Sequence, residues 1–495
     1  MKKILILSSL LGLLLSTSSC REEFLQTEPT ETLADPPAQA KLNGLYLMMI
    51  NTGTGGTTGH DDYGQKGYDL VSDLLSADMV LSGVTYGWYS TIANLSAPVD
   101  YTRDSNYQPW RYYYRVAYAA NDVIAGLGGN DAVPATSSDK AAMGQAKAMR
   151  AYAYFYLMQY FTTGYNPDAL SIPLYVDAGV NGKPKAKQSE VYAQMVKDLT
   201  QAVDLLNGFS RANKGVINKE VAQGLLAYTY AAMGENAKAA DLSLQIITKF
   251  PKTSKEEVVY NEELGSGGGF NDLNTKSWMW GFDLTEANDL DLISWWGQAD
   301  IFTYSYSWVG DAKSIDYSLY DAIRPDDIRK NQFKTVIETA DGYDMFDAKE
   351  DGDYPAVPVN KFYAPGREIG GQRIVTSDYL FMRVDEFHLL AAETLAKSGK
   401  ETQAKTVLMD YLADRIEDTS YINGLSGTAL LNEIYLQTRI ELWGEGKSYL
   451  AMKRNKATIT RGANHLFFAG QSFLYSDDRL SLDIPQAEIN NNPNL

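Results

Sequence analysis

The sequence predicts a mainly α-helical protein with a loop-rich subdomain that contains short strands. Apolar residues recur every three or four positions in several segments, as on the buried face of a helix. A seven-then-five spacing of small residues occurs twice and is typical of paired helices. Three other segments are rich in Gly, Asp, Pro or aromatic residues and have little periodicity, which predicts long loops.

The chain begins with the features of an export signal. Lys2 and Lys3 precede an apolar run over residues 4–15, and small residues follow at 16–19. This run is shorter than the roughly 20 apolar residues that a membrane-spanning helix needs. We therefore predict a signal peptide over residues 1–19, with a mature chain over residues 20–495.

Cys20 directly follows the predicted signal and is the only cysteine, so it cannot form a disulfide within the chain. It is either an incidental small residue or the site of lipid attachment. Its position favours lipid attachment, although Thr17 stands where lipoprotein signals usually have Leu. A multiply acylated Cys20 would hold an otherwise water-exposed protein at a membrane.

Two segments have the clearest helical pattern. Over residues 189–206, Val191, Met195 and Leu199 lie on one face, and Ser189 is the expected N-cap. Over residues 146–161, an apolar stripe runs beside three tyrosines at steps of four, namely Tyr152, Tyr156 and Tyr160. We expect this second helix to be buried on two sides, with the tyrosines in the core.

The repeated spacing lies in two helix pairs. Residues 218–251 begin at a capping Asn218 and turn at Gly234. The spacing of tetratricopeptide repeats is carried here by Ala227, Gly234 and Ala239, and again by Ala392, Gly399 and Ala404. Residues 428 to about 454 predict one further long helix, in which Glu445 can pair with Lys447 and the glycines at 444 and 446 allow close approach to a neighbour.

Three segments do not fit the helical pattern, namely residues 51–68, 260–312 and 341–376. The last contains a series of aspartates: Asp341, Asp344, Asp347, Asp351 and Asp353. A calcium loop and a solvated loop are both compatible with them. The solvated loop is favoured, because Pro358 stands where a helix–loop–helix calcium site needs a bidentate Glu.

Charge and motifs exclude several classes of protein. The net charge is −18, and the longest basic cluster is the scattered Lys183, Lys185 and Lys187, so nucleic acid is not an expected partner. The three histidines lie far apart, no HExxH or GxSxG motif occurs, and the glycines at 265–269 lack the Lys of a phosphate loop. We expect no cofactor and no metal site, and neither zinc-dependent nor serine-type hydrolysis.

Five segments in order resemble the SusD/RagB family of outer-membrane nutrient-binding lipoproteins. They are SSCREEF at the predicted lipidation site, KAMRAYAYFYLMQYF with SIPLYVD, YLFMRVDEFHLLAAETLAKSGKETQA, RIELWGEGKSYLAMKRN, and the closing LDIPQAEINNNPNL. The resemblance runs over residues 20–495 and implies one SusD-like domain. Its four tetratricopeptide-like helix pairs would lie mainly within residues 107–250 and 378–455, and its loop-rich ligand side near residues 51–105 and 260–376.

The resemblance also implies a function. Such proteins are anchored by lipid at the position of Cys20 and exposed on the outer membrane, and Glu22-Glu23 looks like their surface-export signal. They cap a SusC-like TonB-dependent transporter and pass oligosaccharides, or in some members peptides, to it without cleaving them. The expected partners are therefore this transporter and a glycan, with a peptide as the alternative ligand.

A carbohydrate site needs exposed aromatic rings with polar side chains nearby. Two aromatic clusters fall outside helical stripes: Tyr86, Trp88 and Tyr89 in the first, and Trp295, Trp296, Tyr304, Tyr306 and Trp308 in the second. Alternation at Phe302, Tyr304, Tyr306 and Trp308 predicts four rings on one face of a strand or extended loop. Candidate polar partners are Asp78, Asn94, Arg103, Gln298 and Asp300.

Two other functions remain open at this point. A secreted glycoside hydrolase would also be acidic and rich in aromatics, and its carboxylate pair needs no sequence signature. A scaffold without a small ligand is what helical repeats alone would predict.

Overall fold

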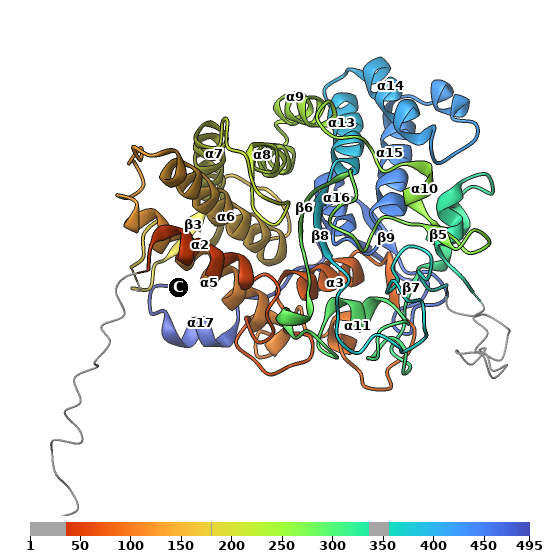
Figure 1. Cartoon of the computed structure of the whole chain (residues 1–495), viewed down its shortest axis with the longest axis horizontal. Helices are drawn as coiled ribbons and strands as arrows, with labels where there is room; N and C mark the ends of the chain where they lie inside the picture. The colour runs from red at the N-terminus through yellow and green to blue at the C-terminus, as the bar shows by residue number, and fades with distance from the viewer. Residues whose placement is uncertain (1–35, 180, 336–355) are drawn as a thin grey trace, which may run out of the picture.

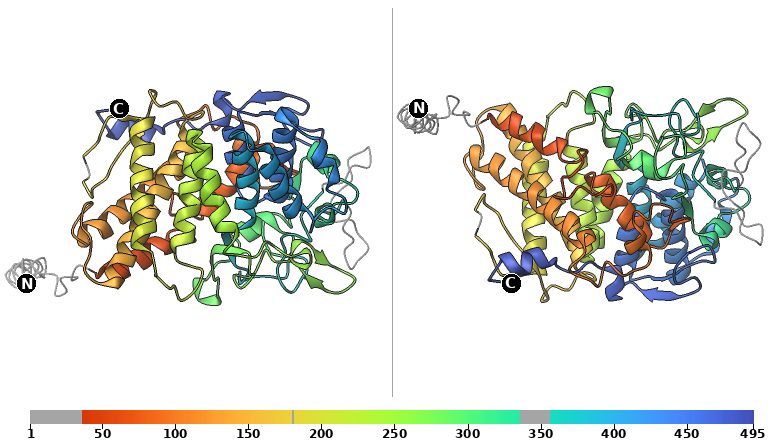
Figure 2. Two further views of the ribbon diagram at one scale, coloured as in Figure 1. Left: turned by 90° about the horizontal axis from the view of Figure 1, so that it is seen from above. Right: turned by 90° about the horizontal axis from the view of Figure 1, so that it is seen from below.

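The computed structural model describes residues 36–179, 181–335 and 356–495, and most of its ordered structure is helical. Eight helices form a continuous series in which each packs on a neighbour, and Figure 2 shows them side by side. They are α5 (Asp104–Gly126), α6 (Ser137–Phe161), α7 (Gln188–Leu205), α8 (Lys219–Met233), α9 (Asn236–Ile247), α13 (Asp385–Lys397), α14 (Glu401–Leu412) and α15 (Gly427–Glu441). The predicted mainly helical class is confirmed.

Other helices complete the body of the molecule. α2 (Ala38–Leu47) packs on α5 and α6, and α3 (Gln65–Leu75) packs on α16 (Ser448–Asn455). The remaining helices are short: α4 (Ser90–Ala93), α10 (Lys255–Val258), α11 (Trp295–Ala299), α12 (Tyr317–Ala322) and α17 (Gln486–Asn491). Short 3-10 helices span Glu286–Asn288, Ile328–Gln332, Ser420–Gly424 and Asp478–Leu480. Among the described helices, none combines the length and apolar character needed to cross a membrane.

The described strands form five separate antiparallel pairs rather than one sheet. The pairs are β1 (Met79–Leu81) with β7 (Lys313–Ile315), β2 (Leu170–Pro173) with β3 (Lys185–Lys187), β4 (Tyr260–Asn261) with β5 (Ser266–Gly267), β6 (Trp278–Phe282) with β8 (Tyr379–Arg383), and β9 (Thr458–Thr460) with β10 (Ser472–Leu474). In Figure 1 the loops that carry α11 and β7 gather at one end of the molecule, beside α3 and away from α7 to α9. This loop-rich end agrees with the expected short strands.

The two repeated helix pairs form as predicted. α8 turns into α9 at Gly234, and α13 turns into α14 at Gly399. Both glycines have left-handed backbone, with φ of 81° and 77°, which a residue with a Cβ rarely adopts. Asn218 caps α8 by accepting a hydrogen bond from the amide of Val221 at 3.0 Å. α6 is buried along its whole length from Ala141 to Phe161, as its double stripe predicts.

Two expectations about helix ends were wrong. α7 begins at Gln188, and the Lys187 amide before it donates to the Glu190 carboxylate at 2.9 Å, so Ser189 lies inside the helix. The single helix expected over 428–454 is two helices, because the chain turns sharply between α15 and α16. At that turn Gly444 has φ of 77°, and an added Cβ would lie 2.5 Å from the Phe362 ring.

The expected Glu445–Lys447 pair does not form, because both side chains bind other partners. Glu445 forms ion pairs with Arg383 at 2.8 Å and Lys361 at 2.8 Å. Lys447 instead donates to the carbonyl of Phe381 at 3.0 Å. These partners come from segments far from 445 in sequence, so local spacing could not reveal them.

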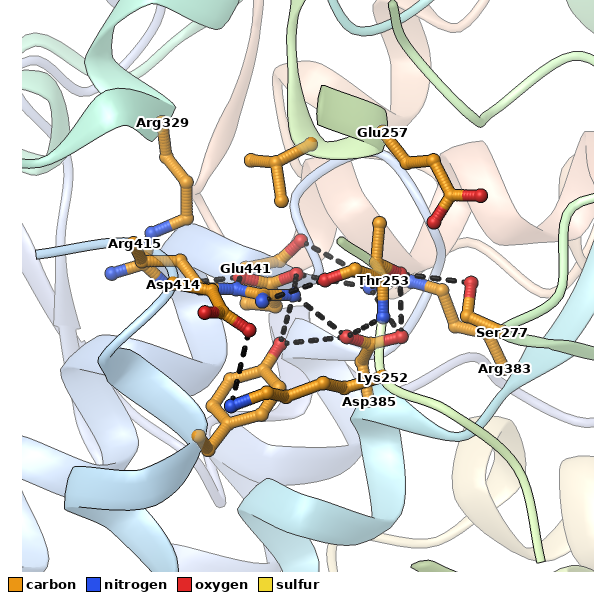
Figure 3. Close-up of polar contacts among 12 residues, drawn as sticks. Lys252, Thr253, Glu257, Ser277, Arg329, Arg383, Asp385, Asp414, Arg415 and Glu441 are labelled. Atoms are coloured by element: carbon orange, nitrogen blue, oxygen red, sulfur yellow. Dashed lines mark hydrogen bonds and ion pairs between the residues drawn. The ribbon is translucent and has the colours of Figure 1, made fainter. Parts of the chain in front are cut away.

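A buried ionic network joins the helical series to the loop-rich end (Figure 3). Its centre is Glu441 on α15, which lies 2.9 Å from Arg383, 3.1 Å from Arg329 and 3.4 Å from Arg415. Asp385 on α13 pairs with Arg415 at 2.8 Å and accepts a 2.7 Å hydrogen bond from the Thr253 hydroxyl. Burial alone would raise the pKa of Glu441, but the arginines lower it, and its pKa lies well below the ordinary value.

Candidate functional site

The pairing of β1 with β7 brings the two predicted aromatic segments together. Met79 pairs with Ile315, and Leu81 pairs with Lys313. Beyond the strands, the amide of Ser82 donates to the carbonyl of Ala312 at 2.9 Å. The loop that follows β1, over residues 82–89, therefore lies beside the loop that precedes β7, over residues 304–312.

Three rings from these loops and the imidazole of His60, from the segment before α3, form one cluster, which we call the aromatic face: His60, Tyr86, Trp88 and Tyr306. Trp88 stacks on His60 with centroids 5.1 Å apart and planes 10° apart. Tyr306 meets Trp88 at 6.0 Å and Tyr86 at 5.2 Å. Tyr86 is 61% exposed and Trp88 is partly exposed, so the cluster offers ring surface to solvent.

Polar atoms accompany these rings. The Tyr306 hydroxyl forms a hydrogen bond with Nδ1 of His60. Burial raises the pKa of Tyr306, so its hydroxyl stays protonated at neutral pH. Nε2 of the same imidazole is free to bond a ligand hydroxyl, since no described residue bonds it.

A second platform lies further along the second loop. Tyr304 packs against Trp308 with centroids 5.0 Å apart, and Tyr304 is 38% exposed. The Arg373 guanidinium lies 3.5 Å from the Tyr304 ring centroid. Gly370 has φ of 63°, and an added Cβ would lie 2.8 Å from the Trp308 indole, so only glycine fits there. The platform thus combines two rings with a cation.

A buried polar group positions the first loop. The Asp311 carboxylate accepts hydrogen bonds from the amides of Tyr86 at 3.1 Å and Gly87 at 3.0 Å. The Lys313 ammonium donates to the Asp311 carbonyl at 2.8 Å and to the amide oxygen of Gln298. Burial lowers the pKa of Lys313 to about 7, while Asp311 opposes the shift. Gln298, a predicted ligand contact, is therefore a buried support beneath the loop.

The expectation that Trp295 and Trp296 are exposed platforms conflicts with the structure. Both are buried in α11, and Trp295 packs edge-on against Phe362 with centroids 4.8 Å apart. α11 begins at a capping Ser294, and its single turn directs both indoles into the core. Tyr89 is also buried, and its hydroxyl donates to that of Tyr63 at 2.7 Å.

The expected strand of alternating aromatics does not form either. Residues 301–310 are a series of bends and turns with one isolated bridge at Thr303. Phe302 is buried, and the Arg367 guanidinium lies 4.9 Å from its ring centroid. Tyr306 is also buried, 5% exposed against Tyr86 and Trp88, whereas Tyr304 and Trp308 reach the surface. Turns, unlike a strand, do not keep alternate side chains on one face.

The remaining polar candidates lie away from these rings or are buried. Asp300 is buried and accepts from the amides of Phe302 and Thr303, and burial raises its pKa to about 7. Asp78 is buried and pairs with Arg439 at 2.6 Å. Asn94 accepts from the amide of Ser96 at 3.0 Å. Arg103 is exposed and pairs with Asp100 at 2.9 Å, with no described contact to the aromatic face.

Sequence reasoning missed four residues of this region, namely His60, Asp311, Lys313 and Arg373. His60 and Arg373 lie in segments with no periodicity, so no signal marked them. Asp311 was accessible, because it follows the second aromatic cluster directly in the string SWVGD. Its carboxylate is already occupied by backbone amides, so it is a support rather than a proton donor.

The described residues give no sign of a metal centre. Among them, no three His, Cys, Asp or Glu side chains converge as a metal site would require. The aspartates considered for calcium, Asp341 to Asp353, and the predicted lipidation site Cys20 lie outside the described residues.

Comparison with known sequences matches two family profiles to this chain. Residues 41–230 match the family described as "Starch-binding associating with outer membrane", and residues 298–495 match the SusD family. A SusD-like protein of Formosa agariphila is 28% identical over 153 residues, which cover 30% of this chain and 28% of the relative. The chain thus aligns with less than a third of that relative's length.

Solved structures match over nearly the whole chain. A SusD-like carbohydrate-binding protein from Bacteroides vulgatus has a TM-score of 0.76 at 25% identity, over 92% of this chain and 96% of its own. A SusD superfamily protein from Bacteroides thetaiotaomicron has a TM-score of 0.74 at 24% identity, over 92% and 98%. Surface glycan-binding protein A from the same organism, solved with laminarihexaose, has a TM-score of 0.64 at 17% identity, over 92% and 97%.

The two profile matches and the shared fold agree with the segments that suggested this family. The chain belongs to the SusD/RagB family of outer-membrane glycan-binding proteins, a family of binding proteins and not of enzymes.

Proposed function

We propose that this protein captures oligosaccharides on its aromatic face and passes them to a SusC-like TonB-dependent outer-membrane transporter. The observation that carries the proposal is the meeting of Tyr86 and Trp88 with Tyr306 in one partly exposed cluster. Aromatic residues from two segments more than 200 positions apart are held together at the surface. Their supports are buried backbone and side-chain hydrogen bonds.

The chemistry of the face suits sugars. A pyranose offers apolar C–H faces to aromatic rings and a rim of hydroxyls to polar groups. Ring surface for the sugar comes from Trp88, Tyr86 and the Tyr304–Trp308 pair. His60, the Tyr306 hydroxyl and Arg373 supply hydrogen-bond partners at the edges of those rings. Stacking tolerates many sugars, while these polar atoms would fix the orientation of the bound one.

The arrangement supports binding without bond cleavage. Asp311, the carboxylate behind the Tyr86 loop, is buried and accepts hydrogen bonds from two backbone amides. A glycosidase needs two carboxyl groups that flank the scissile bond. The relatives solved as a carbohydrate-binding protein and as a laminarihexaose complex support a glycan as the ligand here.

The handover and the membrane anchor are further parts of the proposal. Lipid on Cys20 would tether the chain, and Glu22-Glu23 would direct it to the cell surface. The anchor and the partnership with the transporter can be tested in a bacterium that carries a SusC-like transporter. The full-length protein and a Cys20→Ala variant are each expressed there. The wild type should sediment with outer membranes and co-purify with the transporter. If the variant does the same, the anchor assignment fails.

Isothermal titration of the chain without residues 1–20 against a panel of oligosaccharides and oligopeptides tests the binding proposal. Trp88→Ala and Tyr304→Ala should each weaken the bound glycan about tenfold or more, equivalent to about 1.4 kcal/mol. Tyr101→Ala is the matched control, because Tyr101 is an exposed tyrosine outside the aromatic face. Binding of peptides alone, or glycan binding that both variants retain, would overturn the proposal.

A further inference from the structure

A groove lies apart from the aromatic face, along α5. Its volume is about 650 Å³, and its walls are α5, α17 and the loop over residues 175–179. Figure 1 shows α17 alongside α5, at the end of the series where α2 also lies. Ligand sites typically enclose about 300–1,000 Å³, so the groove has room for several sugar rings or an equivalent ligand.

Aromatic rings line the groove in a row. Trp110, Tyr114 and Tyr118 follow one another at steps of four on α5 and so lie on one side of the helix. Trp110 contacts Tyr114 with centroids 4.8 Å apart, and Tyr114 contacts Tyr175 at 5.8 Å. Trp110 forms the buried floor, whereas Tyr118 is 49% exposed at the open end. The half-buried Tyr114 and the exposed Tyr118 offer two successive ring surfaces to one elongated ligand.

Two arginines stand beside this row with most of their hydrogen-bonding capacity unused. Arg111 donates to the Tyr107 hydroxyl at 3.1 Å, and Arg115 donates to the carbonyl of Thr54 at 2.7 Å. Neither forms an ion pair with an acidic side chain among the described residues. Each guanidinium carries five N–H donors, so donors remain on both.

The acidic side chains of the groove already have partners. Glu488 accepts from the Trp110 indole at 3.3 Å and from Asn492 at 2.9 Å. Asp177 accepts from the amide of Gly179 at 3.0 Å and lies 3.7 Å from the Lys183 ammonium. Because the donors to Glu488 are neutral, the groove keeps two positive and two negative side chains, and the two arginines are the ones with unused hydrogen-bond donors.

We propose that this groove is a second binding site, for an acidic oligosaccharide whose carboxylate or sulfate groups pair with Arg111 and Arg115 while its rings lie along Tyr114 and Tyr118. Guanidinium groups bind such anions through paired hydrogen bonds. A protein-docking surface is the less favoured alternative, because a flat protein interface needs neither a groove of this volume nor a row of rings along it.

The groove is separate from the aromatic face but shares a supporting loop with it. Gln108 near the start of α5 donates to Thr57 at 3.0 Å and to Asp61 at 3.0 Å, next to His60 of the aromatic face. The proposal goes beyond the proposed function, because the groove can bind acidic sugars whether or not the aromatic face binds neutral ones.

Isothermal titration tests the proposal. The chain without residues 1–20 is titrated with three probes, namely tetragalacturonate, a sulfated carrageenan tetrasaccharide and neutral maltotetraose. We expect at least one acidic probe to bind, and its affinity to fall at higher salt because the pairing is electrostatic. Binding of tetragalacturonate alone identifies carboxylates as the recognised group, and binding of the carrageenan probe alone identifies sulfate esters. Absence of binding by both acidic probes would overturn the proposal. Maltotetraose bound at the aromatic face would not, because its affinity should be unchanged by Arg111→Gln/Arg115→Gln.

Three variants locate the site. Arg111→Gln/Arg115→Gln and Tyr118→Ala change exposed side chains, and each should weaken the acidic probe at least tenfold. Tyr86→Ala is the matched control and should leave that affinity unchanged. If only Tyr86→Ala weakens the acidic probe, the sugar binds at the aromatic face, so the groove proposal fails while the proposed function stands. If the arginine variant loses only association with a transporter, the groove is a protein-docking surface instead.

Discussion

Replacement of Glu441 by Gln should destabilise the protein by about 3 kcal/mol. Removing one partner of a buried ion pair typically costs about 3–5 kcal/mol. Gln keeps the shape of Glu441, so the change removes charge with little change in packing. The loss falls at the low end of the range because each arginine keeps another acid: Arg329 lies 2.6 Å from Asp327, and Arg415 lies 2.8 Å from Asp385.

Urea unfolding followed by circular dichroism measures this effect. The midpoint should fall while the slope against denaturant stays the same, since the exposed area on unfolding does not change. Glu417→Gln is the matched control, because Glu417 is exposed, and its stability should stay within about 0.5 kcal/mol of wild type. A loss below about 1 kcal/mol for Glu441→Gln would show that the arginines are not held by this carboxylate.

Three further predictions concern Asp311, Gly444 and Asp300. Asp311→Ala should weaken glycan binding about tenfold, because it frees the amides of Tyr86 and Gly87; unchanged affinity in titration would show that the loop holds its shape unaided. Gly444→Ala should lower the free energy of unfolding by about 1–3 kcal/mol, because its φ is 77° and Phe362 blocks a Cβ; an unchanged urea midpoint would contradict this. The pKa of Asp300 is about 7 in the folded state and 3.8 ordinarily, so between these values the folded state binds more protons than the unfolded state. The free energy of unfolding should therefore fall as pH rises from about 4 to 7, by at most about 1.4 kcal/mol per pH unit. Asp300→Asn should remove this contribution, and identical pH profiles of stability for variant and wild type would refute the assignment.

The helical series was predictable because its signals are local. Asn218 and Gly234 mark the start and end of α8, and Gly399 marks the end of α13, through spacings of a few residues. The break between α15 and α16 was not predictable in the same way. It depends on Gly444 approaching Phe362, a contact between segments about 80 residues apart.

The candidate site was predictable as two regions but not as a set of exposed rings. Composition marked both aromatic segments, and the structure places Trp88 and Tyr306 in contact. Which rings face solvent depends on tertiary structure. Trp296 and Tyr89 have the same local character as Trp88, yet both lie in the core. Burial of an aromatic residue outside a periodic segment is decided by partners that local sequence does not reveal.

The pairing of β1 with β7 also affects how the protein folds. Its hydroxyl contact between Ser82 and Ser314 joins positions 232 residues apart, so it closes a very long loop of chain. Contacts of such high sequence separation form slowly, since the entropy of loop closure is lost before they stabilise the fold. The aromatic face should therefore be absent from partly folded or truncated chains that already contain native helices. Sugar binding would then report completed folding, where helix content by circular dichroism could not.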